Sequence, residues 1–544
     1  MFPDSSIASK FTCSESKCAY LTTFGIAPYF KSLIVAKVKL EKDYVLLFDE
    51  AMNSQLQTKQ LDIHVRFWNE GEVITRYLTS EFLGHATAED LHERLIESCR
   101  SVSLHGIVQL SMDGPNVNRK TYDMLAADIE TETDHKMINI GSCGLHQIHN
   151  AFRTASSDTG WDMEYILQSL YWLFKDTPAR RDDFTKVTGS TVFPKRFCKH
   201  RWLENVTVME RALEMWSNVK AYVETVEKGQ ISNPRTKSYD AISKCCADEL
   251  FLTKANIFIS IAKELSPFLQ KYQTDLPVLP SFAQDFCKML ITIMSRFLTD
   301  DTCSKLTSAA KVIKVDFSSA IIYKEMSKID IGFVAEKLLK QLLFNKKISE
   351  RDVYTIRAVT KSMLSTIVTR LVDNSPIKYA IVRNLGWLIP HNVICIPNDP
   401  CITQLKNCLK ILVESKHVKD SKCDDIIRQF KDFSNESRTN PDFISFVPGT
   451  ARLDTLMHST MQKREDWVDL WGVTKKLLLL SHGQASVERG FSVNKQTMSD
   501  NMEELTIIAQ RAITDHLRSI GGVQNLVMTK ELLISASSVR QKYH

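Results

Sequence analysis

The segment Asp43–Asp49, DYVLLFD, is a short apolar run that ends on an acid. Two further runs follow it, LDIHVRFW at 61–68 and VITRYLTSEFL at 73–83, with the turn NEGE between them. β-branched and aromatic residues favour strands, and a short Gly-containing turn between two such runs is typical of a hairpin. The three runs therefore predict an antiparallel, three-stranded meander.

Helices and single strands alternate after this meander. The amphipathic run 87–102 predicts a helix with its first residue, a threonine, as N-cap and acids in its first turn. Gly106–Asp113, GIVQLSMD, predicts a fourth strand that again ends on an acid, and 118–130 predicts a helix. A fifth strand is expected at 136–143, ending at Gly141 and the serine after it. This order predicts an α/β domain with a mixed sheet.

Beyond about residue 201 the alternation typical of strands gives way to helical spacing. Apolar residues recur every three or four positions as far as residue 435, which predicts successive amphipathic helices. The Pro- and Asn-containing stretch 435–450 closes this region, and helical sequence resumes near 464. The expected fold class is α/β plus all-α. The expected divisions are a helical lead-in at 1–42, an α/β region at 43–200, an all-helical region at 201–450, a C-terminal helical region at 451–522, and a tail at 523–544.

Composition excludes several classes of protein. The chain is 44% hydrophobic and 24% charged, as in ordinary soluble proteins, and no uninterrupted apolar run approaches the ~18 residues of a membrane span. We therefore expect no membrane partner. The thirteen cysteines are scattered, which suits a reducing compartment, and none forms a CxxC…HxxxH pattern. We expect no zinc.

Positive charge is concentrated in one segment. The net charge of the whole chain is +5. Arg180–Arg201 alone holds seven Lys and Arg against two Asp, an excess of the same size. Such clustering favours a phosphate backbone as partner, and a solvated basic loop is the alternative. Within the segment, Lys195, Arg196 and Lys199 are the residues we expect to contact nucleic acid.

Two acids, Asp49 and Asp113, stand at the ends of predicted strands. Ligands gather at the carboxyl ends of strands in open α/β sheets, and adjacent strands lie ~4.8 Å apart. Two carboxylates at neighbouring strand ends repel each other unless a cation neutralises them. With a third acid they could hold two Mg²⁺ ions ~3.5–4 Å apart for phosphoryl transfer. The alternative is that both aspartates form turns or cap helices.

Five short motifs occur in the same order as in one protein family, which the chain therefore resembles. LLFDEAMN contains Asp49, and LSMDGPNVN contains Asp113. SCGLHQIHNAF, HRWLENVTVMERAL and SHGQASVERGFSVNK follow, the last of them containing Glu488. Together, over roughly 44–522, they resemble the hAT superfamily of DDE transposases and their host-domesticated descendants.

The resemblance implies an RNase H-like core. Its first part would be 43–200, the helical region 201–450 would be an insertion, and the C-terminal region 451–522 would complete the core. Its metal-binding catalytic acids would be Asp49, Asp113 and Glu488, with Mg²⁺ or Mn²⁺ as the cofactor of an active enzyme. The third acid lies 375 residues after the second, a gap that fits a large helical insertion. For a lone glutamate such as Glu488 the alternative is a solvated helix face. The small neighbours Gly483 and Ala485, with the serine after them, would let its helix approach the sheet closely.

The resemblance also implies roles around DNA. Arg201 would contact phosphate, and Trp202 would stack on a base flipped out at the DNA end, an interaction worth ~1–3 kcal/mol. The alternative for Trp202 is an ordinary core residue. Cys143 and His146 match a Cys-x-x-His signature that we interpret as structural or DNA-positioning.

In the family, the C-terminal region forms homodimers or higher homo-oligomers. Here the run 503–522 places Leu505, Ile508, Ala509 and Ala512 on one helix face and ends at a Gly-Gly pair, a good C-cap. The alternative is an intradomain core. The chain lacks the N-terminal BED-type zinc finger of active hAT transposases, so recognition of transposon ends is not expected from it.

Three functions are consistent with the sequence. The first is an hAT transposase-derived protein in the nucleus that binds DNA and dimerises but does not transpose on its own. The second is a Mg²⁺-dependent DDE transposase or nuclease, which cuts DNA by phosphoryl transfer. The third is a dimerising scaffold without a nucleic-acid role. The nuclear location follows from the DNA substrate, with only the weak signal PKRFCKHR in support.

Overall fold

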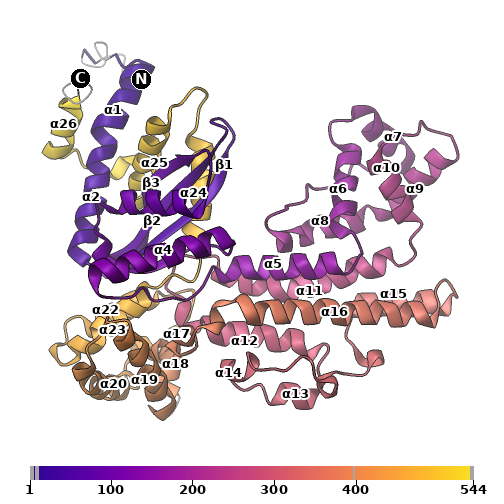
Figure 1. The fold of residues 1–544 in the computed structure, drawn as a ribbon. Helices are drawn as coiled ribbons and strands as arrows, with labels where there is room; N and C mark the ends of the chain where they lie inside the picture. Colours follow the sequence, from indigo (N-terminus) through magenta and orange to yellow (C-terminus); the bar gives the residue numbers. More distant parts are fainter. Residues whose placement is uncertain (1–4, 7–11, 396–397, 540–544) are drawn as a thin grey trace. The chain divides into compact units, whose positions relative to one another are not determined.

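The computed structural model describes residues 5–6, 12–395 and 398–539. Its fold is mixed α/β and mostly helical, with one small sheet (Figure 1), as the class α/β plus all-α predicts. The chain divides into two compact units, the sheet unit and the helical unit. The sheet unit comprises Met1–Cys143, Gln273–Ser281 and Tyr379–His544, and the helical unit comprises Gly144–Tyr272 and Phe282–Lys378.

The predicted meander is confirmed. Strands β1 (Tyr44–Asn53), β2 (Thr58–Asn69) and β3 (Glu72–Leu83) pair antiparallel in sequence order. The fourth strand, β4 (Ile107–Ser111), pairs parallel with β1, so the order across the sheet is β3-β2-β1-β4. The mixed sheet expected from the sequence is therefore present with four strands.

The two acids lie differently from their predicted strand ends. β1 does not stop at Asp49 but continues to Asn53, because β2 remains its partner over that length. Its pairing with β4 ends earlier, at Leu47 opposite Ser111. Asp113 lies two residues beyond the end of β4. Asp49 is thus at the end of the parallel pairing rather than at the end of its strand.

The prediction of a fifth strand at 136–143 is wrong. The segment runs beside β4 and makes two separated backbone hydrogen bonds, from Ile138 N to Val108 O at 2.8 Å and from Cys143 N to Met112 O at 2.9 Å. Gly141 has φ +79°, outside the extended region. A residue in that conformation turns the chain and prevents a regular ladder.

One face of the sheet forms an apolar core. Helices α2 (Ala27–Glu41), α3 (Ala88–Cys99) and α4 (Asn116–Thr133) contribute buried side chains to it. The predicted N-cap of α3 is confirmed as a full capping box, in which Thr87 Oγ1 accepts from Asp90 N and the aspartate carboxylate accepts from Thr87 N.

The other face of the sheet is polar and yet buried. Helices α24 (Ala485–Thr497) and α25 (Glu504–Ser519) contact its strands. The polar residues of this face are almost inaccessible to solvent: Gln60, Asp62, His64 and Arg66 from β2, and Gln109 and Ser111 from β4. Buried polar groups require partners, so this face is a hydrogen-bonded layer and not an ordinary core.

The expected N-terminal helical lead-in is present. It consists of α1 (Glu15–Leu21), a π-helical turn at Thr22–Ile26 and α2. Residues 15–41 are long and apolar enough, by length and composition only, to cross a membrane. The core helix of a soluble protein passes the same test, and α2 buries Ile34 and Val38 in the sheet core. The C-terminal helix α26 (Lys530–Ser537) packs beside this lead-in (Figure 1).

Residues 379–395 and 398–479 of the sheet unit are mostly helical. They include Trp387, which is fully buried. The main helices are α18 (Pro390–Cys395), α19 (Asn398–Glu414), α20 (Cys423–Ser437), α22 (Leu453–Met461) and α23 (Val468–Leu479), with short helices α17 (Ala380–Arg383) and α21 (Pro441–Ile444).

The helical unit contains no strand among its residues, all of which are described. Its helices are α5 (Gly144–Asp158), α6 (Met163–Phe174), α7 (Pro178–Thr188), α8 (Val206–Glu214), α9 (Trp216–Glu227), α10 (Lys237–Cys246), α11 (Phe251–Tyr272), α12 (Leu279–Ser295), α13 (Asp300–Ser304), α14 (Ala309–Val312), α15 (Phe333–Phe344) and α16 (Glu350–Asn374). The helical character expected past residue 201 is confirmed. The unit begins at residue 144, and 379–450 belong to the sheet unit, so its bounds differ from the expected 201–450.

Candidate functional site

The sheet topology places Asp49 and Asp113 at matching positions. Leu47 of β1 stands opposite Ser111 of β4 in the parallel pair, and each aspartate follows two residues later on its own chain. Neighbouring strands lie ~4.8 Å apart, so the two backbones leave the parallel pairing side by side. Both side chains are partly buried, as expected of residues that a ligand must reach.

Each aspartate is held by its own chain segment. Asp49 Oδ1 accepts a hydrogen bond from Glu50 N at 2.8 Å. Asp113 Oδ1 accepts one from the side-chain amide of Asn118, which is 3% exposed in the first turn of α4. The second contact fixes the carboxylate that follows β4 to a buried amide on the next helix.

Glu488 lies in the first turn of α24, where its N–H donates to Gln484 O at 3.0 Å. The loop before this helix is attached to both strands that precede the aspartates. Ser481 exchanges two hydrogen bonds with the buried Gln109 side chain of β4, at 2.8 and 3.0 Å. Gln484 Nε2 donates to Phe48 O of β1 at 2.9 Å, one residue before Asp49. The helix of the third acid therefore starts beside the strand of the first.

Three carboxylates suit Mg²⁺ or Mn²⁺, which prefer oxygen ligands. Among the residues that the structure describes, however, no group of three or more His, Cys, Asp or Glu side chains is arranged to hold a metal ion. The donor types and the shared end of the sheet fit such a cation, whereas the side chains do not form a closed cluster. The metal therefore stays a prediction.

A buried network that sequence reasoning missed lies under α24. Asp62 is fully buried in β2, opposite Asp49 in the register. It accepts hydrogen bonds from Ser80 Oγ at 2.6 Å, from Asn494 Nδ2 at 2.8 Å and from Gln60 Nε2 at 2.9 Å. Burial raises the pKa of the Asp62 carboxyl, and these hydrogen bonds oppose the rise. Because Asn494 belongs to α24, the network joins the sheet to the helix of Glu488.

Gly490 brings α24 close to the polar face. A Cβ at this position would lie 2.9 Å from Arg511 Nη2 and 3.5 Å from both Asp62 Oδ2 and His64 Nε2. Neither ring nitrogen of His64 has a hydrogen-bond partner among the described residues. Burial, with Arg511 and Arg489 nearby, lowers the pKa of His64 well below its usual value. The close approach expected at 483–486 is present, because Ser111 Oγ donates to Gly483 O at 3.5 Å and Gln484 is bonded to β1. Gly490, one turn later, adds a second close contact.

The first part of the basic segment belongs to α7, and the second part forms a loop that is held in place within the helical unit. Residues 189–201 have no regular structure between α7 and a 3₁₀ turn at Trp202–Asn205. The Asn205 side chain accepts from Cys198 N at 2.7 Å and donates to Cys198 O at 2.8 Å. Arg211 Nη1 donates to Phe193 O at 3.2 Å. The loop is thus anchored at two points along its length.

Three cations of this loop face solvent. Lys195, Arg196 and Lys199 are exposed, and none of them takes part in an ion pair within the described chain. Two other cations of the segment are paired, Lys186 with Asp182 at 2.5 Å and Arg201 with Glu204 at 3.1 Å. The three exposed cations of the loop hold charge that is available to a partner.

Trp202 is only 2% exposed and packs edge-on against Phe197, with ring centroids 5.2 Å apart. This is the packing of a core residue, the alternative to base stacking. Trp202 also lines a pocket of about 290 Å³ together with residues of α6 such as Gln168. Arg201 pairs with Glu204 at 3.1 Å. Stacking of Trp202 on a base and contact of Arg201 with phosphate stay predictions.

The Cys-x-x-His motif spans the boundary between the units. Cys143 is buried, and its N–H donates to Met112 O beside the end of β4, which favours a structural role. His146 belongs to α5 of the helical unit. On the same helix, His149 Nδ1 accepts from Leu203 N at 3.3 Å, and burial lowers the pKa of His149 to about 3. The sequence did not predict a role for His149. Its hydrogen bond holds the 3₁₀ turn that contains Trp202.

The helix face expected to support dimers is partly buried within the chain and partly exposed. Ala509 and Ala512 are buried in a small cluster with Ala27 and Tyr77, which is the intradomain alternative. Leu505 is 57% exposed. The expected helix end is confirmed, because Gly521 has φ +80° directly after the C-cap of α25. Self-association stays a prediction.

No family model matches the sequence, and no curated protein matches it closely enough to count as a relative.

Proposed function

We propose that this chain is an hAT transposase-derived protein that binds DNA and self-associates without transposing on its own. The observation that carries DNA binding is the anchored loop, which presents Lys195, Arg196 and Lys199 to solvent without ion-pair partners among the residues that the structure describes. Phosphate contacts by Lys and Arg supply most sequence-independent affinity for DNA. A fixed backbone loses less conformational entropy when its cations bind.

An RNase H-like assignment of the sheet unit belongs to the same proposal. Three features support it: the strand order β3-β2-β1-β4 with β4 parallel to β1, the matching places of Asp49 and Asp113, and a third acid that returns after a long helical stretch. The described part of the sheet unit has no regular fifth strand, and this feature departs from the assignment. A nuclear location follows only from the proposed DNA partner.

Replacing Lys195, Arg196 and Lys199 by alanine should weaken binding to a 30-base-pair duplex of arbitrary sequence. Each lost phosphate contact should reduce the slope of log affinity against log salt by about 0.9, so the triple variant should lose about 2.7 of that slope. Fluorescence anisotropy between 50 and 200 mM salt measures both quantities. The matched control replaces three exposed lysines of the sheet unit, Lys406, Lys410 and Lys431.

Equal losses in the two triple variants would mean that only net charge matters and that the loop is not the binding site. Salt-insensitive or undetectable binding by the wild type would remove the DNA-binding proposal itself.

A metal-dependent nuclease is the second candidate. It is favoured by one observation, the matching register positions of Asp49 and Asp113 at the end of the parallel pairing. A divalent cation there would stabilise the charge that develops in phosphoryl transfer and activate the attacking oxygen. The chain's own part is to position oxygen ligands, with Asn118 orienting Asp113 and Gln484 fixing the start of the helix of Glu488.

Glu488→Gln should reduce Mn²⁺-dependent nicking of supercoiled plasmid to the level seen without metal. The substitution removes one negative charge from the acid set with little change in shape, so DNA binding should be unchanged. The control is Glu504→Gln, at an exposed glutamate in the first turn of α25. The nuclease candidate is rejected if wild type and Glu488→Gln nick equally. If DNA binding is absent as well, the dimerising scaffold remains.

A further inference from the structure

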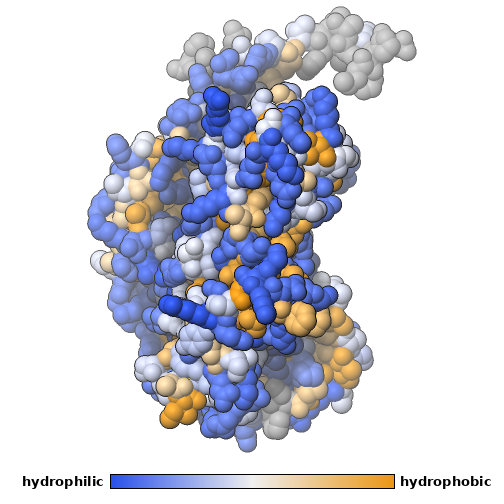
Figure 2. All heavy atoms as spheres, turned by 90° about the vertical axis from the view of Figure 1, so that its right-hand side faces the viewer, coloured by the Kyte–Doolittle hydropathy of each residue, from blue (hydrophilic) through white to orange (hydrophobic). Residues whose placement is uncertain are grey.

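Helix α6 of the helical unit presents two aromatic side chains to solvent. Tyr165 and Trp172 are 55% and 50% exposed, and Gln168 between them is partly exposed. These positions are three and four residues apart, so the three side chains form a stripe along one helix face. All eight tryptophans of the chain are in its described part, and Trp172 alone among them is exposed. Most of the surface drawn in Figure 2 is hydrophilic, and exposed Tyr and Trp are typical of binding surfaces.

The aromatic stripe is not needed for the core of the helical unit. The core contacts of α6 are made by another face of the helix, where Leu167, Leu170 and Phe174 are buried. Lys175 Nζ lies 4.7 Å from the centre of the Trp172 ring, a cation–π contact that holds the indole at the surface. The stripe is therefore an ordered surface feature whose rings can contact a ligand.

The cationic loop 189–201 lies alongside α6. Near the C-terminal end of the helix, Phe193 of the loop contacts Phe174, with ring centroids 5.8 Å apart. Near the N-terminal end, Trp202 directly after the loop lines a pocket of about 290 Å³ together with Tyr165 and Gln168. The three exposed cations of the loop fall between these two contacts in the sequence. Aromatic rings and positive charges without ion-pair partners in the described chain thus occur side by side.

Two acids restrict where a phosphate could lie. Asp162 and Glu164 line the pocket at the Tyr165 end of the stripe, and Glu164 Oε1 accepts from Gln168 Nε2 at 2.7 Å. Carboxylates repel phosphate, so a nucleic-acid strand bound here would place its phosphates on the loop and its bases over α6. A neutral sugar could also stack on Tyr and Trp, but it would gain nothing from the cations. In a duplex the faces of the bases are covered by their neighbours, so only unpaired bases can stack on these rings.

We infer that the exposed face of α6 binds single-stranded nucleic acid by stacking unpaired bases on Tyr165 and Trp172. The two residues are separated by about 10.5 Å along the helix, and stacked bases rise 3.4 Å each, so the rings contact two different bases. Stacking of this kind tolerates any sequence, because every base has a π face. The inference deepens the proposed DNA binding and rests on it for the phosphate contacts, which the loop 189–201 supplies.

The test uses the full-length protein and three fluorescein-labelled probes at the same salt concentration. They are a 12-nucleotide thymidine oligomer, an abasic strand with the same number of phosphates, and a 12-base-pair duplex. Anisotropy should show that the wild type binds the thymidine oligomer at least about 25-fold more tightly than the abasic strand, because each of two stacked bases contributes at least about fivefold. Tyr165→Leu and Trp172→Leu should each weaken binding of the thymidine oligomer at least about fivefold and leave binding of the abasic strand and the duplex unchanged.

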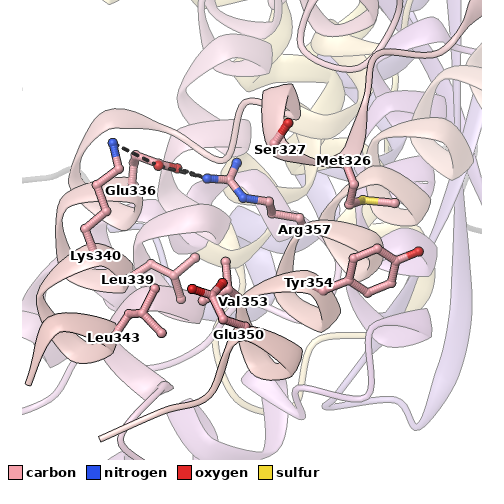
Figure 3. A pocket seen from close by; sticks show the side chains of 10 residues that line it. All are labelled: Met326, Ser327, Glu336, Leu339, Lys340, Leu343, Glu350, Val353, Tyr354 and Arg357. Atoms are coloured by element: carbon pink, nitrogen blue, oxygen red, sulfur yellow. Dashed lines mark hydrogen bonds and ion pairs between the residues drawn. The ribbon is translucent and has the colours of Figure 1, made fainter. Parts of the chain in front are cut away.

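The matched control is Tyr354→Leu, at a tyrosine 59% exposed beside the groove between α15 and α16 of the same unit (Figure 3), and it should bind all three probes like the wild type. Since the stripe residues are at least half exposed, the urea midpoints of the two leucine variants should match the wild type.

Two results would overturn the inference: equal affinity of the wild type for the thymidine oligomer and the abasic strand, or leucine variants that bind the oligomer like the wild type. Duplex binding that depends on the loop would still support the proposed function in either case. Conversely, if the leucine variants weaken binding and the triple loop variant does not, the inference stands and the role of the loop is rejected. Binding of a neutral oligosaccharide that the leucine variants abolish, without binding of the thymidine oligomer, would assign the stripe to carbohydrate instead.

Discussion

Between pH 7.5 and pH 5 the folded chain should lose several kcal/mol of stability, because buried histidines resist protonation. Burial lowers the pKa of His149 to about 3 and that of His417 to about 4. The pKa of His64 is also lowered well below its usual value. One pKa unit corresponds to about 1.4 kcal/mol, so each of the first two should cost about 2 kcal/mol at pH 5.

The direction of this pH dependence follows from comparing histidine protonation in the folded and the unfolded chain. Above pH 6.5 each histidine is neutral in the folded and the unfolded chain, and its contribution is fully present. Below pH 6.5 only the unfolded chain binds the proton, so stability falls until the folded pKa is reached. For His149 this window extends down to about pH 3, and for His417 to about pH 4. The raised pKa of the Asp62 carboxyl acts in the opposite direction, because it favours proton uptake by the folded chain.

Urea unfolding at pH 7.5, 6.5, 5.5 and 5.0 measures the loss, with His149→Gln as the diagnostic variant. His149 lies in the helical unit and His417 in the sheet unit, so each affects the stability of its own unit. The variant should flatten the pH dependence of the helical unit. His85→Gln, at an exposed histidine, should leave it unchanged. Stability that stays constant over this range would show that the histidines are not excluded from water as described.

The elements that could be predicted from sequence are those set by neighbours along the chain. The meander follows from β-branched runs and a hairpin turn, and the capping box at Thr87 depends on residues three apart. The expected strand at 136–143 failed because Gly141 turns the backbone, and a glycine in sequence does not reveal the sign of its φ.

The buried polar face could not be predicted, because its cover comes from far along the chain. In LDIHVRFW the polar residues alternate with apolar ones, a pattern typical of a strand with one face in solvent. The structure instead covers Asp62 and His64 with helices that start more than 400 residues later. The matching register of Asp49 and Asp113 was foreseeable from two strands that precede acids, whereas the role of Asn494 was not.

Asp62→Ala should destabilise the sheet unit by about 3–5 kcal/mol, the cost of removing one partner from a buried charged network. The change leaves the donors of Ser80, Gln60 and Asn494 without their acceptor in a layer closed to water. It also removes a negative charge that faces Arg511. Urea unfolding at pH 7.5 measures the loss. The control is Asp432→Ala, at an exposed aspartate of α20, which should change stability by less than about 0.5 kcal/mol.

Asp62→Asn separates the charge from the hydrogen bonds. Its amide oxygen still accepts from Asn494 or Ser80, so it should cost less than half of the alanine change. Because Asn494 lies six residues after Glu488 on α24, loss of its partner should also speed hydrogen exchange of amides 488–494 before the rest of the unit opens. If Asp62→Ala costs no more than Asp432→Ala, the carboxylate does not hold α24. The position of Glu488 would then depend on the loop that Gln109 and Gln484 attach to the sheet.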